Sequence, residues 1–128
     1  MKVSVRKAIA GLTYLPNRDP EMGHDENTSA AFAELAKYRD GAIHVGYYSG
    51  SSEWERHPAG DELVMALDGE TTLILLIDGE QQRVPLGKDD LAVVPRNVWH
   101  RFEDSDHLKV FAVTPEPSDH QLEVPSTS

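Results

Sequence analysis

Four side chains in the middle of the chain have the types and the spacing of a metal or proton-transfer site. Glu55 and His57 are two residues apart, so an extended strand places both on one face. A tight turn at residues 58–61 follows, Glu62 opens the next predicted strand, and His100 comes after a later turn. Two imidazoles with one or two carboxylates suit Zn, Fe(II), Mn, Ni or Cu, and a two-His, one-carboxylate set leaves positions open for substrate. The pattern therefore predicts one divalent transition metal without identifying it.

Other roles are compatible with the same residues. His57, Glu62 and His100 together form either a metal site or a metal-free polar cluster. Glu55 is a fourth ligand, a general base beside the metal, or a salt-bridge partner. A base differs from a ligand because it must keep a lone pair free and have a pKa near the working pH.

The elements that position these residues are short β-type runs between residues 42 and 115. They include A-I-H-V-G-Y-Y, T-T-L-I-L-L-I and L-K-V-F-A-V-T, and Asp78-Gly79 is the strongest hairpin signal in the chain. No helical pattern interrupts them. The sequence therefore predicts an antiparallel sandwich or barrel.

Strand alternation predicts which side chains face the interior. It places Glu62 and Val64 inward on one strand and His100 and Phe102 inward on another. Tyr48, Val64 and Phe102 are predicted to form the wall of an apolar cavity next to the polar cluster. A polar cluster beside an apolar cavity is the usual composition of a small-molecule site.

Residues 1–41 are predicted to pack on the barrel. Residues 2–5 read as a short strand and residues 16–27, rich in proline and polar residues, as a loop. Residues 30–38 read as an amphipathic helix, because Phe32, Leu35 and Ala36 share a helical face and capping residues precede them. Residues 116–128 read as an irregular tail.

The remaining histidines and the tryptophans are expected to lie outside the site. The histidines are predicted to be a strand residue at His44 and exposed side chains at His24, His107 and His120. Trp54 and Trp99 are predicted by parity to point outward, where they cover the barrel or contact a second subunit.

Length and composition restrict the partners. The 128 residues fit one domain, and the net charge of −10 disfavours nucleic acid and anionic membranes. The longest apolar runs, 63–67 and 73–77, are far shorter than the roughly 20 residues that span a bilayer. Without cysteine, any metal must be held by His, Asp or Glu. We expect a cytoplasmic protein whose partner is a small molecule.

Two segments resemble the motifs of the cupin superfamily, specifically small single-domain cupins. In the first, the gaps from His57 to Glu62 and from Glu62 to Gly69 match the family pattern. In the second, five positions fall on the family spacing: Asp89, Pro95, Asn97, His100 and Asp104. Glu55 stands where the family has its first histidine, and Gly50 lies one residue closer to it than the pattern asks.

Three further departures concern turns. Asp89 and Asn97 stand where the family has glycine, and Asp104 stands where it has asparagine. Asn and Asp tolerate the left-handed conformation that glycine supplies in turns. These three substitutions are therefore compatible with the expected fold.

The resemblance, which covers roughly residues 42–115, implies an all-β jelly-roll (double-stranded β-helix) barrel with a short N-terminal helix. It implies metal binding by His57, Glu62, His100 and Glu55, and commonly a homodimer, for which Trp54 and the N-terminal strand are candidate surfaces. Relatives include cyclases of aromatic polyketide pathways.

The function predicted from the sequence is a metal-dependent enzyme acting on a small organic substrate, of cyclase, isomerase or oxygenase type, with Glu55 as a catalytic candidate. The alternatives are a non-catalytic small-molecule-binding or sensing module, and a cupin that has lost its metal. Cupins host many reactions, so the substrate and the reaction are not predicted.

Overall fold

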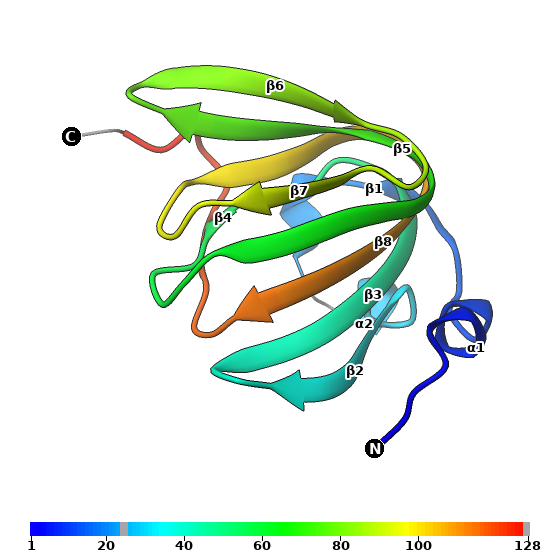
Figure 1. Ribbon diagram of the computed structural model, residues 1–128. Coiled ribbons are helices and arrows are strands. Elements are labelled where there is room, and N and C mark those ends of the chain that lie inside the picture. Colours follow the sequence, from blue (N-terminus) through cyan, green and yellow to red (C-terminus); the bar gives the residue numbers. More distant parts are fainter. Residues whose placement is uncertain (24–25, 127–128) are drawn as a thin grey trace.

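In a computed structural model of the protein, strands make up most of the chain and form two facing layers (Figure 1). The structure describes residues 1–23 and 26–126. The predicted all-β architecture is confirmed, and a short N-terminal helix is present, although at residues 5–10 and not at the predicted residues 30–38. The elements, in chain order, are α1 (Val5–Ala10), β1 (Leu15–Arg18), η1 (Pro20–Met22), α2 (Glu26–Ser29), β2 (Phe32–Tyr38), β3 (Gly41–Gly50), β4 (Trp54–Arg56), β5 (Glu62–Ile77), β6 (Glu80–Leu86), β7 (Leu91–Val94), β8 (His100–Pro115) and β9 (Asp119–Gln121).

Two long strands, β5 and β8, connect the layers. Each has 16 residues, and they pair antiparallel from Leu63 opposite Val113 to Leu75 opposite His100. Register shifts between residues 66 and 72 mark bulges, which bend a strand and increase its twist. One layer therefore has the order β2-β3-β8-β5-β7, and the other has the order β6-β5-β8-β4-β9. This is the predicted jelly-roll arrangement.

The main core lies between the layers. Its buried members come from β3, β5, β8 and the segments around β6 and β7: Tyr48, Val64, Ala66, Leu73, Leu86, Val94, Phe102 and Leu108. Burial of such side chains is the dominant stabilising contribution, about 1.5–3 kcal/mol each. Val64 belongs to this packed core and is 0% exposed.

A second, smaller cluster covers the other face of the β5 hairpin. Ile74 and Leu76 alternate with the inward residues of β5 and pack with Trp54 and Trp99. Trp54 is 1% exposed. It therefore cannot offer the dimer contact considered from the sequence, because other side chains of the same chain already cover it.

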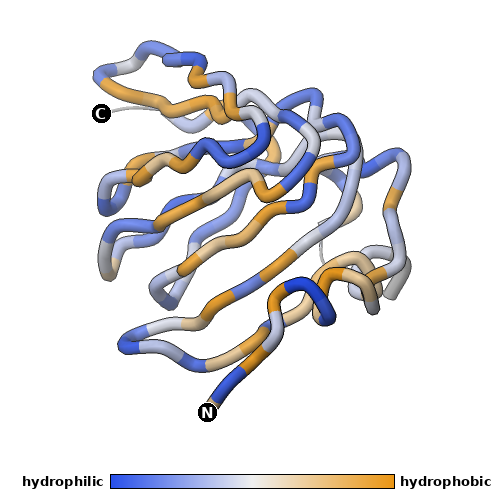
Figure 2. The backbone as a smooth tube through the Cα atoms, turned by 45° about the vertical axis from the view of Figure 1, so that its right-hand side comes forward, coloured by the Kyte–Doolittle hydropathy of each residue, from blue (hydrophilic) through white to orange (hydrophobic). Residues whose placement is uncertain are grey.

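The turn residues adopt the backbone conformations that the sequence predicts. Asp78 and Gly79 join β5 to β6 with φ of 52° and 80°, the left-handed pair of a type I′ hairpin. Figure 2 shows that this turn brings the hydrophobic end of β5 beside the hydrophilic strand β6. Asp89, Asn97 and Asp104 also have left-handed φ, of 71°, 66° and 51°. The substitutions of the family's turn residues are thus accommodated as expected.

Two N-terminal predictions were wrong. Residues 2–5 do not form a strand: α1 begins at Val5 beside β3, and the Ser4 side chain accepts a hydrogen bond from the Lys7 amide as the N-cap. Residues 30–38 do not form a helix, because residues 32–38 are strand β2, antiparallel to β3. The register of β2 shifts between Glu34 and Ala36.

Two further segments are more ordered than predicted. The expected loop 16–27 contains most of β1, which pairs parallel with β3. The expected irregular tail contains β9, which pairs with β4. The prediction for His24 lies outside the described residues. None of the helices in the described ranges is long and apolar enough to cross a membrane.

Candidate metal centre

The four predicted ligands meet at one end of the space between the layers. Glu55 lies on β4, directly opposite His100, the first residue of β8. His57 follows β4, and Glu62 opens β5 after the intervening turn. The backbone amide of Asn97 donates to the carbonyl of His57, which ties the two turns together. The ligand atoms of Glu55, His57, Glu62 and His100 all lie within 4.8 Å of one another.

The two imidazoles face the same carboxylate oxygens. His100 Nε2 lies 3.0 Å from Glu62 Oε1 and 3.3 Å from Glu55 Oε1. His57 Nε2 lies 3.3 Å from Glu62 Oε1 and 3.6 Å from Glu55 Oε1. Four lone-pair-bearing atoms therefore converge on one point.

The outward atoms of the same side chains are held by the scaffold. His100 Nδ1 lies 3.0 Å from the Val98 carbonyl oxygen, to which it donates, so that Nε2 is the nitrogen left for the cluster. His57 Nδ1 lies 2.7 Å from Ser118 Oγ, and Thr114 Oγ1 donates to Glu62 Oε2 at 2.6 Å. Partners of this kind orient metal ligands and fix the tautomer of a ligating histidine.

The cluster requires a cation. Burial alone would lower the pKa of each histidine, but hydrogen bonds and charge interactions with Glu55 and Glu62 raise the pKa of His57 to about 9 and that of His100 to about 10. Burial would raise the pKa of both carboxyls, yet the imidazoles lower it, most strongly for Glu55. Without a metal, protons on the histidines balance the carboxylates.

A divalent metal fits the same arrangement. Zinc bonds to His N and carboxylate O are about 2.0–2.2 Å long, so adjacent ligand atoms of a tetrahedral site lie about 3.3–3.6 Å apart. The measured His-to-Glu separations are 3.0–3.6 Å. His57 Nε2 is buried and faces the Glu55 and Glu62 carboxylates at 3.6 and 3.3 Å without a hydrogen bond of good geometry, as expected of an atom placed to bind an ion between them.

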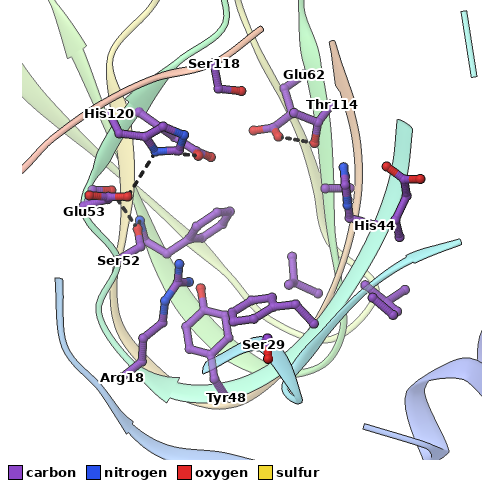
Figure 3. A pocket seen from close by; sticks show the side chains of 18 of the residues that line it. Arg18, Ser29, His44, Tyr48, Ser52, Glu53, Glu62, Thr114, Ser118 and His120 are labelled. Atoms are coloured by element: carbon purple, nitrogen blue, oxygen red, sulfur yellow. Dashed lines mark hydrogen bonds and ion pairs between the residues drawn. The ribbon is translucent and has the colours of Figure 1, made fainter. Parts of the chain in front are cut away.

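The centre opens into a cavity of about 500 Å³ (Figure 3). Glu55 and Glu62 both line it. Of the three predicted wall residues, Tyr48 and Phe102 line the cavity, whereas Val64 is packed in the core and does not. The cluster is thus accessible to a small molecule.

Comparison with known proteins agrees with this geometry. A model of the cupin domain matches residues 44–114, more than half of the chain. The protein is a cupin.

Curated relatives of this cupin match only in part. The uncharacterized protein YdbB of Bacillus subtilis (strain 168) is 29% identical over 68 residues, which are 52% of this chain and 57% of YdbB. An acireductone dioxygenase of Rhodopseudomonas palustris (strain TIE-1) is 35% identical over 60 residues, 47% of this chain and 36% of the enzyme. The matched segment thus spans between about a third and somewhat over half of these relatives.

Solved structures share the fold at low identity. Protein NMB1881 from Neisseria meningitidis has a TM-score of 0.62 at 16% identity and covers 91% of this cupin and 100% of that chain. A hydroquinone 1,2-dioxygenase from Sphingomonas sp. TTNP3, with 4-hydroxybenzoate bound, has a TM-score of 0.57 at 21% identity and covers 67% of this chain and 65% of that chain. These likenesses show the fold alone.

His107 and His120 were both predicted to be exposed and to lie outside the site. His107 is exposed, as predicted. His120 is also exposed, as predicted, but it lies on strand β9 and lines the cavity, with Nδ1 at 3.1 Å from Glu53 and 3.8 Å from Glu55. The position of His120 in the cavity was not predicted, because the three-residue strand D-H-Q has no apolar pattern.

His44 lies on a strand, as predicted, and also lines the cavity. With Glu34 and Glu116 it forms a second group of possible ligand atoms within 4.8 Å. Lys37 lies 3.2 Å from Glu34 and 3.7 Å from Glu116, so the ammonium group already supplies a cation to this exposed group.

Arg18 is a charged residue of the cavity that was not predicted from the sequence. It closes β1 and lines the cavity with its guanidinium over the rings of Phe32 and Tyr48, at 4.8 and 4.5 Å from the ring centroids. The position was assigned to a loop, and only the parallel pairing of β1 with β3 brings it inside.

Proposed function

We propose that this cupin is a metal-dependent enzyme acting on a small organic substrate that has a carbonyl or enolate oxygen. One observation carries the proposal: two imidazole nitrogens and two carboxylate oxygens converge within 4.8 Å at the wall of a cavity of substrate size. When bound, a divalent transition metal would act as a Lewis acid and polarise such an oxygen.

The two carboxylates are suited to different roles. Glu62 is 3% exposed and its Oε2 accepts a hydrogen bond from Thr114, so it is fixed as a ligand together with His57 and His100. Glu55 is 25% exposed and faces the cavity. The imidazoles lower the pKa of Glu55 well below its usual range, so its exposure to the cavity, and not its pKa, supports a role in proton transfer. We assign Glu55 as the group that moves a proton of the substrate.

An oxygenase reaction is the second candidate, and the sequence match to an acireductone dioxygenase favours it. Such a reaction would require a redox metal such as iron in place of a purely Lewis-acidic ion. Glu55 replaces a histidine of the family pattern, so the donor set is richer in oxygen than a three-histidine site. We therefore place proton transfer first.

The test is a reaction screen on metal-loaded protein. A panel of 2-oxo acids and 1,3-dicarbonyl compounds is incubated in D₂O, with deuterium incorporation followed by proton NMR and oxygen uptake by an electrode. Deuterium exchange without oxygen uptake, lost in Glu55→Gln, supports the first candidate. Oxygen uptake by the Fe(II) form alone supports the second. Compounds that bind and return unchanged would contradict both and favour a binding or sensing module.

A cytoplasmic homodimer stays a prediction. The outward side chains of β7 supply an apolar surface for it, since Leu91 is 56% and Val93 is 53% exposed. Light scattering of Leu91→Lys beside the native protein tests this surface, and a mass unchanged by the substitution would contradict its use.

A further inference from the structure

The cavity contains a cation away from the four ligands. Arg18 reaches it from β1 and lies over the Tyr48 and Phe32 rings, and Figure 3 shows Arg18 and the Tyr48 hydroxyl directed into the same space. Within residues 1–23 and 26–126, no carboxylate forms an ion pair with Arg18. The guanidinium is therefore available to an anion.

Tyr48 supplies a second donor at the same place. The side chain is 1% exposed, yet its hydroxyl makes no hydrogen bond of good geometry among the described residues, although the Arg18 guanidinium and the Ser105 hydroxyl lie close enough to lower its pKa. A buried hydroxyl without a partner is costly and needs an explanation. Burial raises the pKa of the phenol, so the hydroxyl keeps its proton and can donate it to a ligand.

The backbone holds Arg18 at this position. Arg18 is paired with Gly50, and the Ser51 amide donates to the Arg18 carbonyl at 3.0 Å. Gly50 has a φ of +111°, and a Cβ added there would lie 2.2 Å from the Arg18 carbonyl oxygen. Only glycine allows β1 to approach so closely. Gly50 thus positions Arg18.

We propose that Arg18 and Tyr48 form an anion-binding subsite, and that the substrate carries a carboxylate which this pair binds while the rest of the molecule reaches the metal centre. This inference rests on the proposed function. A planar guanidinium matches a carboxylate with two parallel hydrogen bonds. Among the described residues that line the cavity, Arg18 is the one permanent cation, and the carboxylates of Glu53, Glu55 and Glu62 also line it, so a monoanion suits the cavity better than a phosphate dianion.

The subsite predicts charge-selective binding that can be measured without knowing the substrate. Acetate, benzoate and 3-phenylpropionate are titrated by calorimetry beside the corresponding neutral amides, with inorganic phosphate as a further probe. We expect at least one carboxylate to bind about tenfold or more tightly than its amide, as charge-assisted hydrogen bonds require. Equal binding of acid and amide in all three pairs, no binding of any, or preferred binding of phosphate would overturn the inference.

Single-residue variants show which side chains bind the carboxylate. Arg18→Met should weaken carboxylate binding by about tenfold or more, and Tyr48→Phe by a smaller factor, whereas Arg6→Met on the exposed face of α1 should not change it. Thermal melts show whether each variant is folded. If Arg18→Met does not fold, Tyr48→Phe alone tests the subsite. Carboxylate binding that survives both variants would contradict the assignment.

The failure of this inference and that of the proposed function are distinguishable. Metal content is measured in the same proteins, and Arg18→Met should retain its metal. Loss of carboxylate binding with metal retained supports the subsite, and metal present without charge-selective binding overturns the subsite alone. Charge-selective binding in a protein that takes up no metal supports the subsite and removes the metal-dependent reaction.

Discussion

At the residue scale, each histidine of the centre uses one ring nitrogen for the scaffold and presents the other to the cluster. His57 Nδ1 is bound by Ser118 Oγ and His100 Nδ1 by the Val98 carbonyl oxygen. The first contact comes from a side chain in the C-terminal segment, beyond the family-matched residues 44–114. It can therefore be removed without altering either motif.

Ser118→Ala tests this contact. We expect metal affinity to fall by about tenfold to a hundredfold, because loss of a partner that orients a ligating histidine typically has this cost. Competition of the protein with a zinc-binding dye measures the affinity, and Ser126→Ala in the exposed part of the same tail is the control. An affinity equal in the two variants would contradict the role of Ser118.

Substitution of each carboxylate should affect metal content and activity differently. Glu62→Gln is expected to lose metal, because the fixed oxygen that faces both imidazoles becomes part of a neutral amide. Glu55→Gln is expected to retain most of its metal and to lose deuterium exchange by about 10²–10⁴-fold, the usual contribution of a positioned acid or base. Metal lost equally from both variants would show that Glu55 is a fourth ligand.

At the element scale, predictions from sequence succeeded where short-range chemistry decides the structure. The Asp78-Gly79 hairpin and the inward alternation of Glu62 and Val64 follow from backbone conformation and strand periodicity. The four ligands came together as expected, because motif spacing and strand alternation determine their positions.

The failures have equally local causes. In β2, the register shift beside Leu35 breaks the two-residue alternation and gives Phe32, Leu35 and Ala36 a helix-like spacing. In β9, three polar residues form a strand only because β4 pairs with them, as β3 pairs with β1. Such pairing depends on distant partners that sequence periodicity does not show, and both Arg18 and His120 were missed for this reason.

Gly50→Ala tests the pairing of β1 with β3. A side chain at φ +111° is strained by about 1–3 kcal/mol, and its Cβ would meet the Arg18 carbonyl, so β1 must move. We expect reduced stability and loss of benzoate binding with metal content unchanged. Gly11→Ala is the control, because its added Cβ meets nothing closer than 3.5 Å. Benzoate binding unchanged in Gly50→Ala would contradict this account of how Arg18 is held.

At the scale of the whole molecule, the site makes stability depend on pH. The pKa values of His57 and His100 are raised to about 9 and about 10, so their stabilisation is complete below about pH 6.5 and is lost as pH rises through 9 and 10. The pKa values of Glu55 and Glu62 are lowered, so their contribution is present above about pH 4.5 and is lost as pH falls.

Metal-free protein should therefore become less stable between pH 7 and pH 10, as measured by urea unfolding in the presence of a chelator. Metal replaces the two protons, so the stabilisation by added Zn²⁺ should grow over the same range. The double variant His57→Ala/His100→Ala should show neither trend. Metal-free stability that rises toward pH 10 would contradict the coupling between the histidines and carboxylates.

The metal centre is tested most directly by elemental analysis of tag-free protein purified without chelator, beside His57→Ala, His100→Ala and the exposed control His107→Ala. We expect about one divalent transition metal per chain in the native protein and the control, and its loss in both site variants. A native protein that contains no metal and takes up none when Zn²⁺, Fe²⁺, Mn²⁺ or Ni²⁺ is added would contradict this expectation.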